Sequence, residues 1–174
     1  MTLREILTRA TEIVGTVSFD PADSDGEQLI SCARFVCAEC ADRYADLVAR
    51  ETVTSTEKRI PFSSLTHSVK RILSVKRNGR PVPFRQEIDG IGVDADGSYE
   101  TEYAYFSERK NLDETLDLPA YFSIDALTFG TVAEYYLRNG FVEDSLLYKN
   151  RYDQAVRNDL RQKKAGYLPY RRFV

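Results

Sequence analysis

The spacing of apolar residues changes twice along the chain, and this change constrains the fold more than any other feature. Apolar residues recur every three or four positions through residue 50, alternate with polar residues in the middle, and return to the helical spacing before residue 166. A helix buries residues three or four positions apart, whereas a strand buries every second residue. A segment whose apolar residues have one of these spacings therefore does not suit the other structure. The order predicts an α+β fold: a four-helix bundle (two helices, then two helices) with an inserted small antiparallel β domain and an extended C-terminal tail.

Four segments follow from this pattern. A chain of 174 residues suits one domain, or one domain that carries an insertion. We expect a first helical part at residues 1–50, an inserted antiparallel β region at 51–110, a second helical part at 111–166 and a tail at 167–174.

Two helices are predicted before residue 50. The first begins at "TLRE", where Thr2 and Glu5 match a capping box, and it ends at Gly15. The second runs from about Asp25 to Ala49, with an apolar stripe that keeps the helical spacing throughout. That stripe consists of Leu29, Ala33, Val36, Cys37, Cys40, Ala41, Tyr44, Leu47 and Val48.

Two more helices are predicted after residue 122. One begins near Ser123 or Asp125 and ends before Gly140, and the other ends at Gly166. The packed face of the last helix is expected to hold Leu146, Leu147, Tyr152, Ala155, Val156 and Leu160.

The middle region reads as five or six short strands in antiparallel hairpins. Asn78-Gly79 stands between two alternating runs, which is a strong hairpin signal, and Asp96-Gly97 marks a second turn. In the run that follows, one face of the strand is predicted to hold Tyr99, Thr101, Tyr103 and Tyr105.

The residues that most often carry chemistry form no recognisable site in the sequence. Cys32, Cys37 and Cys40 have C-x4-C-x2-C spacing, but a plant-type iron–sulfur site needs a fourth cysteine and the chain has only three. We expect these cysteines to be small buried hydrophobic residues of a helix. His67, the one histidine, is interpreted as a loop residue without a special role. No nucleotide-binding or hydrolase motif is present, so we expect no enzyme, no catalytic residue, no metal and no cofactor.

Charge is distributed unevenly along the chain. The net charge of −3 does not favour nucleic acid as a partner, and no apolar stretch is long enough to span a bilayer. Residues 1–50 hold nine acidic and five basic side chains, a net charge of −4. The chain from Arg157 onward holds six basic side chains and one acidic side chain, a net charge of +5. Such a bipolar molecule suits head-to-tail association, although cations also favour the C-terminal end of any helix.

The last eight residues have the composition of an interface. They are Tyr167, Leu168, Pro169, Tyr170, Arg171, Arg172, Phe173 and Val174. Disordered tails are poor in aromatic residues, whereas aromatic residues and arginine are enriched where proteins bind each other. We expect this tail to dock either onto another protein or onto its own helices.

Four stretches of the sequence resemble the head–tail connector proteins of tailed bacteriophages, which are also called neck or adaptor proteins. The first is "LTRATEIVG" with the long helix "EQLISCARFVCAECADRYADLVARE", and the second is "IPFSSLTHSVKRILSVKRNGRPVPFR". The third, "LTFGTVAEYYLRNGFVEDSLLYKNRYDQAV", is similar to that family's pattern G-x-x-A-E-Y followed by G-x-x-E, and the fourth is the terminal "RRFV". Asp144-Ser145 and the lack of tryptophan depart from the family pattern.

The resemblance implies a structural protein of the virion. It also implies that about a dozen copies would form a homo-oligomeric ring below the portal protein. This ring would extend the channel for the viral DNA, which would pass through without sequence-specific binding. The tail Tyr167–Val174 would bind the portal, and the β region would face the next neck or tail-completion protein. Such a protein is made in the host cytoplasm, and its N-terminal segment, with charges among the apolar residues, is unlike a signal peptide.

Two other function classes remain open at this point. A nucleic-acid-binding module would use the basic hairpin at residues 70–85 to contact phosphates. Its six cations are Lys70, Arg71, Lys76, Arg77, Arg80 and Arg85. A small enzyme could assemble a site from scattered residues around a pocket.

Overall fold

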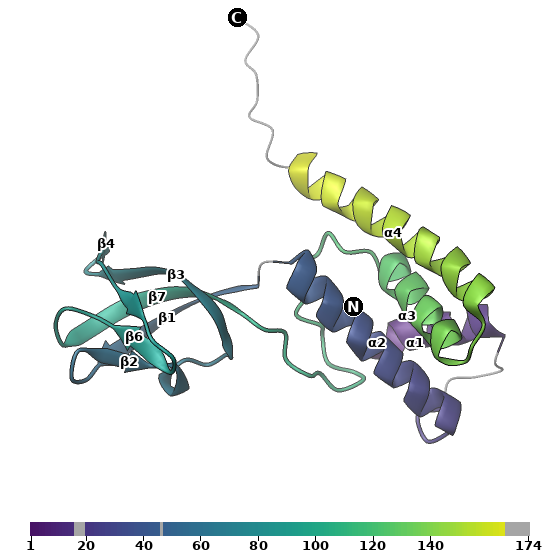
Figure 1. The fold of residues 1–174 in the computed structure, drawn as a ribbon, viewed down its shortest axis with the longest axis horizontal. Coiled ribbons are helices and arrows are strands. Elements are labelled where there is room, and N and C mark those ends of the chain that lie inside the picture. The colour runs from purple at the N-terminus through teal and green to yellow at the C-terminus, as the bar shows by residue number, and fades with distance from the viewer. Residues whose placement is uncertain (16–19, 46, 166–174) are drawn as a thin grey trace, which may run out of the picture. The chain divides into compact units, whose positions relative to one another are not determined.

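The chain folds into two compact units. The computed structural model describes residues 1–15, 20–45 and 47–165. One unit, called here the helical unit, combines Met1–Ala45 with the chain from Arg109 onward, and the other, the β unit, comprises Asp46–Glu108 (Figure 1). The inserted β unit therefore interrupts the helical unit in sequence.

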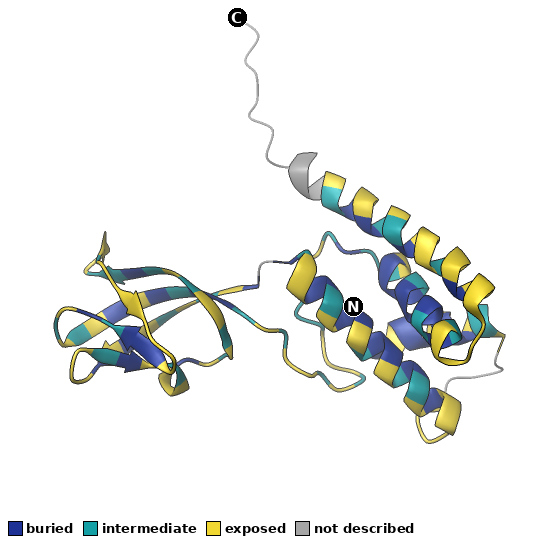
Figure 2. Ribbon diagram, viewed as in Figure 1, coloured by how far each residue is buried: buried dark blue, intermediate teal, exposed yellow. Residues whose placement is uncertain are grey.

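The described residues of the helical unit form four helices, two from each side of the insertion. They are α1 (Leu3–Val14), α2 (Ser24–Arg43), α3 (Ile124–Arg138) and α4 (Val142–Ala165). Among these, α3 packs closely against each of the other three helices, and α1 also packs against α2. Residues on almost every side of α3 are buried, which is typical of a helix enclosed by its neighbours (Figure 2).

Local sequence signals set the helix ends. At α1 the Thr2 hydroxyl accepts a hydrogen bond from the Glu5 N–H, and the Glu5 carboxylate accepts one from the Thr2 N–H, as the capping box predicts. Ser123 caps α3 by accepting the Ala126 N–H at 3.2 Å. Gly140 has a φ of 81°, so the tight turn between α3 and α4 uses the backbone freedom of glycine.

A buried carboxylate fastens α4 to the start of α3. Asp159 is only 5% exposed, and its Oδ2 atom accepts hydrogen bonds from both the N–H and the hydroxyl of Ser123, each at 2.9 Å. The same serine therefore caps α3 and binds α4.

In the β unit, residues 47–108 form seven strands in two antiparallel sheets. The strands are β1 (Val48–Ser55), β2 (Arg59–Pro61), β3 (Val69–Arg77), β4 (Arg80–Pro81), β5 (Arg85–Gln86), β6 (Gly90–Gly92) and β7 (Gly97–Tyr105), with a 3-10 turn at Phe62–Ser64. One sheet has the order β1-β7-β3-β4 and the other has the order β2-β6-β5. Both sheets contribute to a single apolar cluster: Val53, Ile60, Leu65, Val75, Ile91, Val93, Tyr99 and Tyr103.

Two turns of the β unit place residues in the left-handed region. The predicted hairpin turn at Asn78 and Gly79 is confirmed, with φ values of 52° and 74°. The turn between β1 and β2 uses Glu57 and Lys58, at φ 55° and 59°, although neither residue is glycine or asparagine. The Asp96 carboxylate supports this strained turn by accepting the Lys58 N–H at 2.6 Å.

The structure corrects the predicted fold class in two respects. The chain is α+β with two helices before and two after the β region, but the helices do not form a four-helix bundle, because α4 packs mainly along the central α3. The inserted β unit is compact, but its described residues form seven strands in two sheets instead of the predicted five or six strands. Strands of two or three residues are too short to show an alternating pattern, so the sequence could not reveal them. The predicted tail and Gly166 lie outside the described residues.

The second helix is also shorter than predicted. It ends at Arg43 instead of near Ala49, and Val48 already belongs to β1, where it pairs with Ala104 of β7. Leu47 and Val48 continue the helical spacing by chance, but pairing with a distant strand decides their structure.

Candidate interaction site

The hairpin of α3 and α4 leaves large apolar side chains in solvent. Leu146 and Leu147 are 59% and 48% exposed, so their predicted place on the packed face of α4 is wrong. Ser145 and Tyr152 point inward instead, and the Ser145 hydroxyl donates to the Ala133 carbonyl at 2.9 Å. The inward face of α4 continues with Val156 and Asp159, at helical spacing from Tyr152.

These exposed residues border a groove on the helical unit, called here the apolar groove. It has a volume of about 290 Å³. Gly130 and Ala133 of α3 lie at its floor, between residues of α2 and α4. Its large exposed side chains are Phe35, Leu137, Val142 and Leu146, each more than half exposed.

Gly130 brings the three helices of the groove together. A Cβ atom at this position would lie 2.7 Å from Val36 Cγ1 and 2.9 Å from Tyr152 Cδ2. The hydroxyl of Tyr152 in turn lies 3.2 Å from the Cys40 sulfur of α2. The groove therefore has a rigid, closely packed floor.

The charges around the groove are mostly neutralised within the helical unit. Glu39 pairs with Arg43 at 2.7 Å, and Glu134 pairs with Arg138 at 2.8 Å. Lys149 is the exception, since its ammonium lies 3.7 Å from Asp153, near the outer limit of an ion pair. Exposed apolar side chains gathered at a groove are typical of a binding surface, and the Lys149 ammonium beside them also lies 4.5 Å from the centre of the Tyr152 ring.

The three cysteines are buried in α2, as expected. Burial raises the pKa of the Cys32 and Cys40 thiols to about 11 and that of Cys37 to about 12. Within the described residues, histidine, cysteine, aspartate and glutamate form no group of three or more that could hold a metal ion. These thiols act as apolar core residues.

His67 has partners that the sequence did not reveal. Its ring stacks on Tyr105 with 4.2 Å between centroids, and its Nδ1 atom lies 2.8 Å from a Glu108 carboxylate oxygen. The His67 N–H donates to the Tyr103 hydroxyl, which donates to Glu51 at 2.5 Å. Burial, and then the bond to Glu51, raise the pKa of Tyr103 to about 12. These contacts hold the loop that precedes β3 against strand β7, so His67 has a structural role.

The basic hairpin does not form one continuous cationic strip. Arg77 and Arg80 lie on the four-stranded sheet, whereas Arg85 lies on the three-stranded sheet. The Arg77 guanidinium donates to the Asp96 carbonyl at 3.1 Å and lies 5.7 Å from the centre of the Tyr99 ring.

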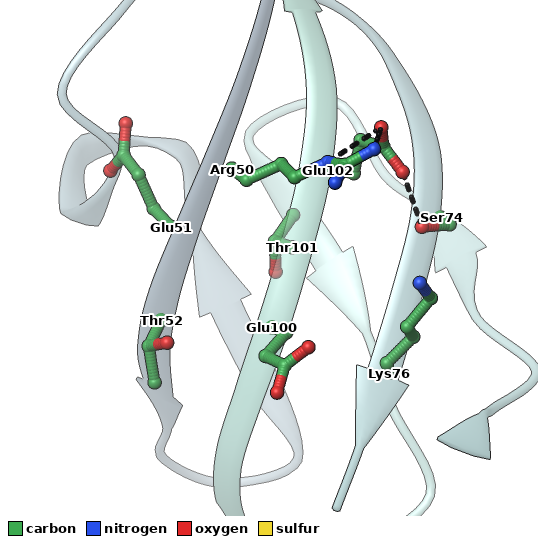
Figure 3. Close-up of a pocket in the computed structure, with 8 residues that line it drawn as sticks. All are labelled: Arg50, Glu51, Thr52, Ser74, Lys76, Glu100, Thr101 and Glu102. Atoms are coloured by element: carbon green, nitrogen blue, oxygen red, sulfur yellow. Dashed lines mark hydrogen bonds and ion pairs between the residues drawn. The ribbon is translucent and has the colours of Figure 1, made fainter. Parts of the chain in front are cut away.

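A shallow polar hollow lies on the four-stranded sheet (Figure 3). Arg50 of β1 donates to Glu102 of β7 at 2.9 Å, and the other Glu102 oxygen accepts from Ser74 of β3 at 3.2 Å. The bond from Arg50 and the nearby charge of Lys76 hold the pKa of Glu102 below its usual value, despite some desolvation. Arg50 and Lys76 share this face with Glu100 and Glu102, so it lacks the single positive sign of charge that a phosphate backbone attracts.

The predicted tail, Tyr167–Val174, lies outside the described residues, so the structure does not place it beside any partner or helix. Among the residues that are described, no helix has both the length and the apolar character to cross a membrane. The sequence matches no protein-family model and no curated protein.

Proposed function

We propose that this protein is a structural subunit of the neck of a tailed bacteriophage. Copies of it would form a ring-shaped connector below the portal, link the head to the tail and extend the channel for the DNA. The observation that carries this proposal is the apolar groove, with Phe35, Leu137, Val142 and Leu146 exposed around it. In an isolated monomer this apolar surface stays exposed to water, whereas in an assembly a neighbouring protein can bury it.

The sequence motif that resembles connector proteins supports the same proposal. In "LTFGTVAEYYLRNGF", Gly130 allows the close packing of α2, α3 and α4, and Gly140 makes the turn into α4. Ala133 lies at the floor of the groove, and Glu134 pairs with Arg138 beside it. The motif residues therefore pack the helices and line the groove, which suits a structural protein.

The tail is proposed to bind the portal. Tyr167–Val174 follows the last helix and combines three aromatic side chains with Arg171 and Arg172. Aromatic and arginine residues commonly provide most of the binding energy at protein interfaces. Residues of this kind each cost on the order of 2 kcal/mol or more when truncated, so losing two of them weakens binding roughly a thousandfold.

Deletion of the tail tests this proposal. The full chain and a variant that lacks Tyr167–Val174 are compared for binding to the cognate portal protein by biolayer interferometry. The full chain should bind, and the deletion variant should bind at least a thousandfold more weakly while its melting temperature stays nearly unchanged. Failure of the full chain to bind the portal would contradict the proposed function. Undiminished binding by the deletion variant would assign portal recognition to another surface.

A further inference from the structure

One apolar side chain of the β unit is entirely exposed. Ile88 has a relative exposure of 101% and is the middle residue of the three-residue turn, Glu87–Asp89, between β5 and β6. The Glu87 N–H closes this turn by donating to the Gly90 carbonyl at 2.9 Å. Turns favour Gly, Pro, Asn, Asp and Ser, so the geometry of the turn does not explain an isoleucine at this position.

The turn that carries Ile88 is firmly held. Arg59 of β2 pairs with the Asp89 carboxylate and lies 3.4 Å from that of Glu87, so one guanidinium joins the residues on both sides of Ile88. The Asp89 carbonyl also accepts the Phe62 N–H at 2.9 Å. Because the turn is fixed in advance, inserting Ile88 into a partner would cost little conformational entropy.

The apolar groove of the helical unit has the properties that such a side chain needs. A closed apolar cavity of about 150 Å³ can hold a benzene-sized group, and the groove has a volume of about 290 Å³. Its walls include Phe35, Leu137 and Leu146. It is thus large and apolar enough to receive an isoleucine side chain.

The charges beside Ile88 and beside the groove are also complementary. Glu87 and Asp89 both pair with Arg59, and the Asp89 side chain is 71% exposed, so a carboxylate stays accessible next to Ile88. Lys149 lines the groove with a side chain that is 47% exposed, and its ammonium lies 3.7 Å from Asp153 and 4.5 Å from the centre of the Tyr152 ring. A carboxylate that accompanies Ile88 could therefore pair with Lys149.

We infer that Ile88 of one copy inserts into the apolar groove of a second copy. The two surfaces are different and belong to the same chain, so each copy offers one of each to its neighbours. Repetition of such a heterologous contact produces a closed ring or a filament. This inference rests on the proposed function, since it names the contact between neighbouring subunits of the ring.

The test compares three charged variants of the full chain. Ile88→Asp removes the inserted side chain, Leu146→Asp blocks the groove, and Leu147→Asp is the matched control, because Leu147 is exposed on α4 but does not line the groove. All three positions are about half exposed or more, so each variant should keep the wild-type circular dichroism spectrum. Self-association is measured by sedimentation velocity over a range of concentrations, with and without the cognate portal.

Wild type and Leu147→Asp should assemble, whereas Ile88→Asp and Leu146→Asp should each associate at least tenfold more weakly. An equimolar mixture of Ile88→Asp and Leu146→Asp should give one-to-one pairs that do not grow, because one variant keeps an intact groove and the other keeps Ile88. Assembly by Ile88→Asp at the wild-type affinity overturns the inference while the proposed ring survives. A wild type that remains monomeric both alone and with the portal overturns the inference and the ring together.

Discussion

The buried carboxylate of Asp159 provides a quantitative test of how the helical unit is held together. Its Oδ2 atom accepts two hydrogen bonds from Ser123, each at 2.9 Å, and the residue is 5% exposed. Hydrogen bonds to a charged group contribute about 1.5–3 kcal/mol each when well buried, and Ser123 is only half-buried. We therefore expect Asp159→Ala to lower the free energy of unfolding by about 2–4 kcal/mol. Asp159→Asn keeps one acceptor and should lose about 1–2 kcal/mol.

The assay is urea unfolding followed by far-ultraviolet circular dichroism, which mainly reports the helices. Asp153→Ala is the matched control, because Asp153 also lies on α4 but has a side chain that is 41% exposed and pairs with Lys149 at 3.7 Å. An exposed pair of this kind should contribute less than about 0.5 kcal/mol. If Asp159→Ala destabilises the protein no more than Asp153→Ala does, the connection between α3 and α4 is not held in this way.

Three other predictions address the packing and the turns. Gly130→Ala should lower the free energy of unfolding by about 1–3 kcal/mol in the same urea assay, because its new methyl group would lie 2.7 Å from Val36 Cγ1. A variant as stable as the wild type would contradict the close packing of the helices. Lys58→Gly should raise the stability of the β unit by about 0.5–1 kcal/mol, because Lys58 sits at φ 59°, and tyrosine near-ultraviolet dichroism during heating measures this. The thiols of α2 should resist alkylation near neutral pH in the folded protein and react readily in urea, because burial raises their pKa to about 11–12. The folded state favours the protonated form of these thiols. Their contribution to the free energy of unfolding is therefore present in full below the ordinary thiol pKa of 9.0, and it is lost as the pH rises through 11–12.

Helix caps and a hairpin turn were predicted correctly from short sequence motifs. The capping box at Thr2 and Glu5, the cap at Ser123 and the Asn78-Gly79 turn all appear in the structure, because each depends on residues at most three positions apart. The alternating face of β7 was also predicted, since Tyr99, Thr101 and Tyr103 are buried together.

Features that depend on distant residues were not predicted. The end of α2 was misplaced because Val48 pairs with Ala104, more than fifty positions away. The partners of His67 were missed for the same reason, since Tyr103 and Glu108 follow it by 36 and 41 positions.

The apolar groove was missed although the sequence contained a signal for it. Leu146 and Leu147 are adjacent, and adjacent residues of a helix point about 100° apart, so a narrow contact with one neighbouring helix cannot bury both. With Phe141 and Val142 just before them, this helix start holds more apolar residues than one packed face needs. Such an excess indicates a second surface, but only the structure shows that α2 and α3 complete it as a groove.

The central claim is that copies of this chain form a ring on a portal, and imaging of that complex tests it most directly. The cognate portal is incubated with an excess of the full chain, and the particles are examined by negative-stain electron microscopy and weighed by mass photometry. We expect a ring of identical subunits, coaxial with the portal, and a mass increase equal to a whole number of 19.9 kDa chains, with one number dominant. Bare portals at saturating protein, or a mass that rises gradually without a preferred number of subunits, would contradict the claim.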